Sequence, residues 1–450
     1  MIETLRSRSR SAAGPAFQRG LTLLELMVAM LLGLLVSAGI VALFTATNQT
    51  SRVQAAMSRI QENGRFAMSR IEADLRMAGA MFRQSSAADS STWTRGTQGA
   101  LMPRNAVLVN TNALVLQDLG TETGRLLEWP APSIYPLSAS FFIRGYECST
   151  GTCTPAVPTG SNGFPPAGTA AGNRVVGSDA LTVKYVRGTG WAYAIAPVGA
   201  TGYAANFVVD STSSDGTFNF ASGDLVLVSD CGGSAPMLFQ ANVAGFVLTP
   251  RPGTLLDASK FVVGAGEGTC DERVFNFTRD FATISYWLQL VADPNPAAPG
   301  RLIPTLMRRE DGVAQEVAQG VERLDFLYGA AMISTGGMAY LTADQVAPNS
   351  TVANCPKPSR SFQSGGVDIA NWREPACLWR SLRSIEVHAL FNTVDDVAVM
   401  SPQDMAYWYS VDSGSGPVAP GATMPVTGLT SGRMMRREFV SLASVRNGSN

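Results

Sequence analysis

The chain has 450 residues, enough for one large elaborated domain or for two to four smaller ones. Charged residues make up only 15% of it and the formal net charge is -1. Bulk electrostatics therefore do not indicate a nucleic acid or an acidic substrate as partner. The function must be sought in the order of the residues along the chain.

The N-terminal region joins a basic leader to a long apolar segment. Residues 1–20 carry four arginines against one glutamate, and the segment from Leu21 to Phe44 contains Glu25 as its only charged residue. As a helix, this segment spans about 36 Å at about 1.5 Å per residue, and a bilayer core is about 30 Å thick. Because arginines favour the cytoplasmic side, the sequence predicts one membrane span, residues 21–44, with the remainder of the chain exported.

An ordinary secretory signal is the alternative interpretation, with cleavage at the small residues near Ala38. The apolar run continues past that site to Phe44, and an acidic residue at its start has no role in such a signal. An acidic side chain in a membrane helix costs about 2.5–3.5 kcal/mol, so Glu25 indicates a partner group.

The stretch RGLTLLEL, residues 19–26, resembles the type III signal of type IV prepilins and pseudopilins. The resemblance implies that residues 1–20 are a leader and that a prepilin peptidase cleaves between Gly20 and Leu21. Mature chains of the family usually begin with Phe, whereas Leu21 stands here, and N-methylation of its amine is the corresponding expectation. Glu25 becomes mature residue five and, about 6 Å along the helix from Leu21, is expected to dock against a neighbouring subunit's amine. Snorkelling of Glu25 into the interface is the simpler alternative.

The helical period continues beyond Phe44 to Ala78. Apolar residues and one glycine recur at spacings of three and four: Val53, Met57, Ile60, Gly64, Ala67, Ile71, Leu75 and Ala78. The charged residues, Asp74 among them, are assigned to the other faces, and Gly79 is the expected stop. The helix from Leu21 to about Ala78 is thus predicted to be roughly 87 Å long. Its amphipathic half, residues 45–80, must pack against a core.

Residues 81–450 are predicted to form a β-rich globular head. Runs rich in β-branched and aromatic residues, or with alternating polarity, predict strands at 180–186, 224–229, 283–291, 323–329, 384–391 and 437–445. Short helices are predicted at 311–322 and 342–347. The expected fold class is α+β, with a long N-terminal helix packed on an antiparallel sheet. Four Gly-, Pro-, Ser- and Thr-rich stretches are interpreted as large loop insertions: 148–178, 198–223, 343–368 and 411–433.

Six cysteines follow the apolar segment: Cys148, Cys153, Cys231, Cys270, Cys355 and Cys377. An even number on an exported chain predicts disulfides. Six cysteines allow fifteen pairings, of which pairing between sequence neighbours is the simplest. Zinc is the rival interpretation, but His388 is the only histidine and paired C-x2-C motifs are lacking, so we expect no metal site.

Enzyme motifs are lacking as well. The chain has no G-x-S-x-G, no H-E-x-x-H and no phosphate-binding G-x-x-x-x-G-K-[ST]. His388 stands in a predicted strand and is interpreted as a sheet residue. Loop carboxylates at 215–224 and 395–396 offer ligands for calcium, but they do not have EF-hand spacing. We therefore expect neither an enzyme nor a cofactor, with a membrane-anchored exported hydrolase as the alternative of a different class.

Segments of the head resemble, in the same order, recurring segments of PilW-type minor pilins: 74–82, 320–329 with 340–346, 378–391 and 435–447. The resemblance implies a minor pilin that joins other minor pilins and the major pilin, primes pilus assembly and sits at the tip, in twitching motility and adhesion. It implies the prepilin peptidase, the inner-membrane assembly platform and a tip adhesin as partners. The chain would lie in the bacterial inner membrane with a periplasmic head, then in the pilus at the cell surface. A J-type pseudopilin of a type II secretion system, usually much smaller, is the alternative.

Overall fold

The computed structural model divides the chain into two compact units, residues 1–56 and residues 57–450. It describes residues 22–79, 88–89, 102–103, 142–149, 151–159, 163–198, 204–213, 217–229, 237–251, 273–331, 337–346, 378–379, 382–397, 401, 403, 405–412, 417 and 432–445.

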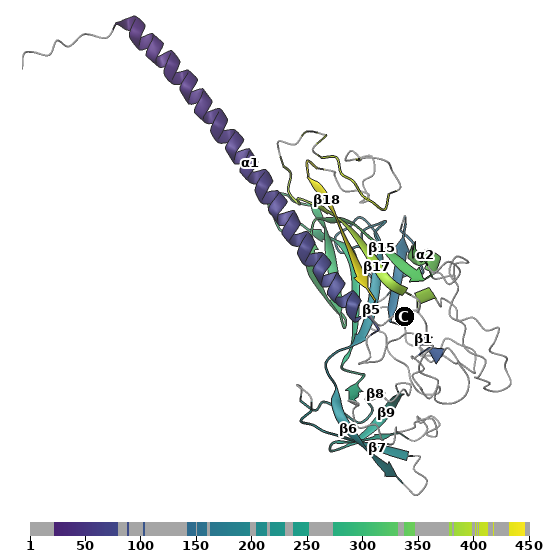
Figure 1. The fold of residues 1–450 in the computed structure, drawn as a ribbon. Helices are drawn as coiled ribbons and strands as arrows, with labels where there is room; N and C mark the ends of the chain where they lie inside the picture. Colours follow the sequence, from purple (N-terminus) through teal and green to yellow (C-terminus); the bar gives the residue numbers. More distant parts are fainter. Residues whose placement is uncertain are drawn as a thin grey trace, which may run out of the picture. The chain divides into compact units, whose positions relative to one another are not determined.

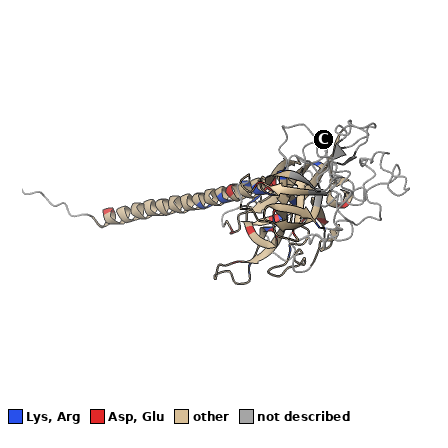
Figure 2. Cartoon of the chain, turned by 90° about the horizontal axis from the view of Figure 1, so that it is seen from below, with Lys and Arg blue, Asp and Glu red and all other residues tan. Residues whose placement is uncertain are grey.

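The first helix, α1, covers Leu23–Met77 and is drawn in purple in Figure 1. It is 55 residues long, which confirms the predicted helix over the residues that the structure describes. Figure 2 shows one acidic position at its start, then a long uncharged stretch, then charged residues in its second part. After Met77 the chain turns at Gly79, whose φ is 70° and whose N–H donates to the carbonyl oxygen of Lys184 at 2.9 Å. A glycine in this left-handed conformation is a common helix stop, as predicted.

Six antiparallel strands form the main sheet, in the order β14-β13-β12-β5-β3-β4. Their bounds in chain order are β3 Ile143–Cys148, β4 Cys153–Thr154, β5 Ala180–Val186, β12 Phe281–Ala292, β13 Leu302–Glu310 and β14 Val313–Gln319. The predicted strands 180–186 and 283–291 lie on β5 and β12. Both strands are almost continuously buried, which explains why their sequences are apolar rather than strictly alternating.

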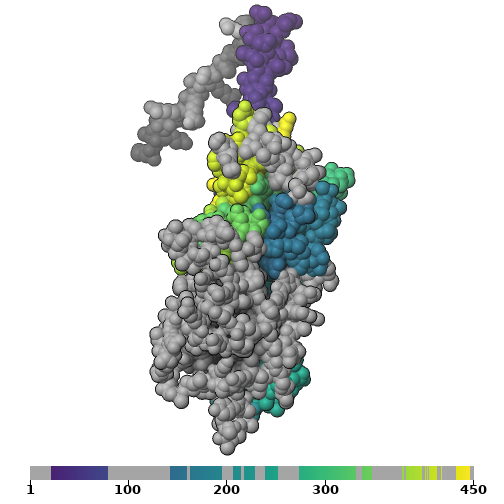
Figure 3. Space-filling view, turned by 90° about the vertical axis from the view of Figure 1, so that its right-hand side faces the viewer, coloured from purple at the N-terminus to yellow at the C-terminus, as the bar shows by residue number. Residues whose placement is uncertain are grey.

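Four antiparallel strands form a second sheet, in the order β16-β15-β17-β18. Their bounds are β15 Val321–Ala331, β16 Met338–Leu341, β17 Leu382–Asn392 and β18 Arg436–Ser444. The three predicted strands in this part of the chain lie on β15, β17 and β18. Leu324, Phe326 and Tyr328 of β15 are all buried, as their alternation predicts. Segments far apart in sequence meet in the head, and Figure 3 shows yellow C-terminal residues beside blue residues that precede position 200.

A closed barrel of six strands, in the order β10-β7-β6-β11-β8-β9, is inserted between β5 and β12. Its strands are β6 Trp191–Val198, β7 Ala204–Val209, β8 Leu225–Ser229, β9 Met237–Ala244, β10 Val247–Pro250 and β11 Arg273–Asn276. Val186 and Phe281 are partners in the main sheet, so the chain leaves for the barrel and returns from it at the same place. The barrel has its own apolar cluster, which includes Trp191, Phe207 and Phe239.

The barrel corrects two expectations. The predicted strand 224–229 belongs to it as β8, and the stretch 198–223, interpreted as a loop, contains β7. Over the residues that the structure describes, the head therefore contains a six-stranded sheet, a four-stranded sheet, a two-stranded pair and a barrel instead of a single sheet with loop insertions. Closing a sheet into a barrel removes its exposed edges, so six strands of four to eight residues can enclose a core of their own.

The helix predicted at 311–322 is wrong, because those residues form the turn after β13, the strand β14 and the start of β15. Asp311 and Gly312 have φ angles of 47° and 90°. Asp-Gly between two strands favours this two-residue hairpin turn. The other short helix is confirmed in part, as α2 at Ala343–Val346. Two short strands, β1 Ala88–Asp89 and β2 Met102–Pro103, pair with each other.

Residues 57–77 of α1 pack on the head through one face. Its buried members are Ile60, Gly64, Ala67, Met68, Ile71, Asp74 and Leu75. The apolar ones join the large cluster formed by β5, β12, β15 and β17. The predicted stripe is confirmed for Ile60 through Leu75. Asp74 is a correction, because it lies on this buried face rather than among the exposed charges.

Candidate functional site

The start of α1 carries the sequence-predicted docking residue. Gly20 and Leu21, the predicted cleavage pair, lie outside the described residues. Glu25 lies in the first turn, where its Oε2 accepts hydrogen bonds from the backbone N–H and the hydroxyl of Thr22, both at 3.0 Å. The N–H of Glu25 donates in return to the Thr22 hydroxyl oxygen at 3.2 Å. This reciprocal arrangement is a capping box, which sets where the helix begins.

The apolar segment that follows is exposed along its whole length. Of the helices that the structure describes, α1 is long and apolar enough to cross a membrane, with a mean hydropathy of 2.6 over its best window. Its large side chains are 47–78% exposed between Leu23 and Phe44. Such a surface is unfavourable in water and requires lipid or other helices around it.

Asp74 joins α1 to the main sheet through four hydrogen bonds. Its Oδ1 accepts from the Tyr185 hydroxyl at 2.9 Å and from Nη2 of Arg308 at 3.2 Å. Its Oδ2 accepts from the Tyr286 hydroxyl at 2.5 Å and from Nε of Arg308 at 2.7 Å. The three donors stand on the neighbouring strands β5, β12 and β13. We call these four residues the Asp74 cluster.

The Asp74 cluster is buried, and its charges are mutually compensated. Burial and the Asp74 charge both raise the pKa of Tyr185 and of Tyr286, so both hydroxyls remain donors at neutral pH. Burial works to lower the pKa of Arg308, but its hydrogen bonds to Asp74 and Glu310 outweigh burial and raise it. The spacing in the sequence indicates that Asp74 is buried, because it follows Ile71 by three residues and so lies on the apolar stripe.

A second polar site joins the two sheets. Asp179, next to β5, accepts from the N–H of Cys148 on β3 at 2.9 Å and from the N–H of Phe326 on β15 at 3.2 Å. Burial, reinforced by the charge of Asp325, raises the pKa of Asp179 well above its ordinary range. The same two causes raise the pKa of Glu147 to about 7. The neutral form of Asp179 is therefore favoured in the folded head, whereas Glu147 changes its charge near neutral pH.

His388 lies on the strand β17, as its interpretation as a sheet residue predicts, and contacts a serine and two glutamates. Its Nδ1 lies 2.9 Å from the Ser410 hydroxyl and 3.0 Å from Oε1 of Glu438, and its Nε2 lies 3.4 Å from Glu386. A catalytic relay needs the hydroxyl and the carboxylate on opposite ring nitrogens. Here the Glu438 carboxylate meets the same ring nitrogen, Nδ1, as the Ser410 hydroxyl, and that hydroxyl donates directly to Glu438 at 2.6 Å. The Glu386 carboxylate lies near the opposite nitrogen at the longer distance of 3.4 Å. These contacts hold Ser410 against β17 and β18.

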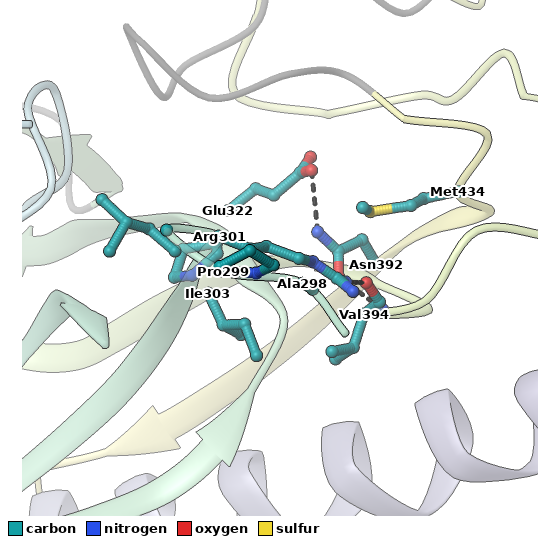
Figure 4. Close-up of a pocket in the computed structure, with 11 residues that line it drawn as sticks. Ala298, Pro299, Arg301, Ile303, Glu322, Asn392, Val394 and Met434 are labelled. Atoms are coloured by element: carbon teal, nitrogen blue, oxygen red, sulfur yellow. Dashed lines mark hydrogen bonds between the residues drawn. The ribbon is translucent and has the colours of Figure 1, made fainter. Parts of the chain in front are cut away.

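A pocket of about 380 Å³ opens where β13 begins (Figure 4). Glu322 at its edge accepts from Nδ2 of Asn392 at 2.8 Å and from Nε of Arg436 at 2.7 Å. Nη1 of Arg301 lies 3.3 Å from carboxylate oxygens of both Asp293 and Asp395. The charged groups at this pocket are thus engaged with each other, and most of the remaining lining is apolar: Ala298, Pro299, Leu302, Ile303, Pro304, Val394 and Met434.

Cys148 and Cys153 form a disulfide between β3 and β4. This bridge fits the pairing of sequence neighbours. The other four predicted disulfide cysteines, Cys231, Cys270, Cys355 and Cys377, lie outside the described residues.

The loop carboxylates considered for calcium have protein partners where the structure describes them. Asp224 accepts from the Ala221 N–H and from Nδ2 of Asn276, both at 2.8 Å. Asp396 accepts from the N–H of Arg433 at 2.9 Å. Within the described part of the chain, no group of three or more histidine, cysteine, aspartate or glutamate side chains is arranged to hold a metal ion. Asp215 lies outside that part.

Comparison with protein families finds a match at the start of the chain. Residues 16–41 match the prokaryotic N-terminal methylation motif. No curated protein and no solved structure matches the chain. The motif and the long apolar helix together support a structural, type IV pilin-like protein. Anchoring in the inner membrane, an extracellular head and assembly with other pilins all fit this motif and helix.

Proposed function

We propose that this chain is a PilW-like minor pilin of the type IV pilus. In this role it is a structural subunit that joins other minor pilins and the major pilin in a complex that primes pilus assembly and sits at the tip. The observation that carries the proposal is the matched motif at 16–41, followed by one helix whose apolar part is exposed and whose later part is buried in a β-rich head.

Maturation follows from the leader. A prepilin peptidase cleaves between Gly20 and Leu21 on the cytoplasmic side, and the new amine of Leu21 is then methylated. Residues 21–44 hold the chain in the inner membrane until the assembly platform transfers the subunit into a filament. Support comes from the arginines of the leader, which favour the cytoplasmic side of the membrane.

Glu25 docks the subunit against its neighbour. Its carboxylate is held by Thr22, one residue from the amine that cleavage creates at Leu21. In the low dielectric of a membrane or a filament core, a carboxylate and an ammonium group attract strongly. The Glu25 carboxylate of one subunit is therefore suited to meet the Leu21 amine of the next.

The size of the head favours the pilus over a secretion system. A J-type pseudopilin shares the leader and the helix but is usually much smaller. Here a barrel is inserted between two strands of the main sheet and adds surface to the head. Surface of this kind suits adhesion or the mounting of a larger tip adhesin.

Deletion of the gene, with complementation, tests the proposal. We expect loss of surface pili and twitching, with exoprotein release unchanged. Lost secretion with normal piliation would instead assign the chain to a type II secretion system. Complementation with Glu25→Ala should restore membrane insertion and cleavage but not co-purification with other pilins, whereas Glu62→Ala, an exposed acid on the same helix, should restore all three.

A further inference from the structure

The apolar stripe of α1 does not by itself fix how the helix lies on the head. Its members between Ile60 and Ala78 are small or medium apolar residues repeated every three or four positions. A shift by one turn would replace Ile71 with Ala67 or Leu75, and each of these is also fully buried. Because apolar burial is non-directional, such shifted arrangements compete with the native one.

Asp74 cannot make the same shift. One helical turn moves a side chain by about 5.4 Å along the axis, far more than a hydrogen bond tolerates. The carboxylate would lose the hydroxyls of Tyr185 and Tyr286 together with both bonds from Arg308. Arg308, only 5% exposed, would then lose its Asp74 counter-charge.

The side chain of Arg308 is held in place by a neighbouring residue of the main sheet. Its Nη1 donates to Oε2 of Glu310 at 2.5 Å. Glu310 also accepts from Arg187 at 2.8 Å. The guanidinium therefore presents Nε and Nη2 to the helix in one orientation, and a planar fork of donors fits a carboxylate in one geometry.

A second contact on the same helix face also opposes a shift of α1 on the head. Gly64 lies against the ring of Phe439 on β18, and a Cβ there would come within 2.4 Å of the ring. Gly64 and Asp74 are ten residues apart, about 15 Å along the axis. A slide or a rotation of α1 would disturb both contacts at once.

We propose that Asp74 is a register-setting residue, which fixes the axial and rotational position of residues 57–77 of α1 on the main sheet. Buried ion pairs are weak evidence of added stability, and selecting one register is the role best attested for them. This consequence rests on the proposed function. When the helix enters a filament, the Asp74 cluster fixes the axial and rotational position of the head on residues 57–77.

The test replaces the Asp74 cluster with apolar residues of similar size, because removing Asp74 alone would leave Arg308 unpaired. The variant combines Asp74→Leu, Arg308→Met, Tyr185→Phe and Tyr286→Phe in the full-length chain in detergent micelles. Ketone-bearing residues at the exposed positions Ala73 and Gln315 carry nitroxide labels, so that the native cysteines are not used. Pulsed electron resonance then measures the distance between α1 and β14.

We expect one narrow distance in the native chain. The apolar variant should keep its circular dichroism spectrum but show a broadened distribution or a second distance displaced by about 5.4 Å, one helical turn. The control Glu72→Gln removes an exposed ion pair with Arg76 and should leave the narrow distance unchanged. An apolar variant that keeps the native narrow distance would overturn the proposal. A variant that fails to fold would also overturn it, because the cluster would then be required for stability and not for register. These measurements do not depend on piliation, so they remain decisive if the pilus assignment fails.

Discussion

Replacing Gly64 with alanine should weaken the contact between α1 and the head, although alanine is the better helix former. In an exposed helix interior, this change stabilises by about 1 kcal/mol. At Gly64, however, the added Cβ would lie 2.4–2.6 Å from three ring atoms of Phe439. That ring packs edge-on against Phe391, with centroids 5.2 Å apart. Overpacking of this kind costs about 1–3 kcal/mol, so the net expectation is a loss of about 0–2 kcal/mol.

A double-mutant cycle with Phe439→Ala isolates this clash. Without the ring, Gly64→Ala should stabilise the helix by about 1 kcal/mol, so the effect changes sign between the two backgrounds. Hydrogen exchange of the amides between Ile60 and Met77 measures the change in the free energy of opening of the helix, because about 1.4 kcal/mol corresponds to a tenfold change in protection. Equal effects of Gly64→Ala in both backgrounds would refute the reasoning.

Three further predictions concern the head and the start of α1. Because burial raises the pKa of Glu147 to about 7 from 4.5, its contribution to stability is complete below pH 4.5 and is lost as the pH rises through 7. Thermal melts from pH 4 to 8 should show this loss, and Glu147→Gln should reduce the slope without abolishing it, because the raised pKa of Asp179 acts in the same direction; an unchanged slope would contradict the assignment. Replacing Cys148 and Cys153 with serine opens a short loop, so urea denaturation should show a loss of about 2 kcal/mol, and no change would argue against the disulfide. Thr22→Val removes the capping hydroxyl, which should cost about 0.5–2 kcal/mol and raise hydrogen exchange in the first turn of α1, whereas Thr22→Ser should not.

Elements with strong local patterns were predictable from the sequence. The stripe from Ile60 to Leu75 predicts the buried face of α1, and Gly79 predicts its stop. The runs at 180–186 and 384–391 predict β5 and β17, because buried strands concentrate β-branched and aromatic residues.

The barrel was not predictable in the same way. Strands such as β7 and β10 are short, and their apolar side chains form a core only because the six strands close on each other, which no local pattern reports. The hairpin at Asp311 has the local pattern of a helix, because Val313 and Val317 stand four residues apart, which matches a helical period. The Asp-Gly turn overrides that pattern.

Asp74 shows the limit of polarity as a guide to exposure. A charged residue is normally assigned to solvent, and its burial depends on donors that are 111 to 234 residues away in the chain. No local pattern reports the presence of Tyr185 or Arg308 opposite the helix. The start of α1 is the reverse case, since Thr22 and Glu25 are three residues apart and their capping box is a local motif.

The most direct test of the account is N-terminal sequencing and intact-mass measurement of the mature chain from its native membrane. We expect a chain that begins at Leu21, with the mass of residues 21–450 and one added methyl group on the new amine. A chain that begins at Met1, or at Gly39 after an ordinary signal peptidase, would contradict it.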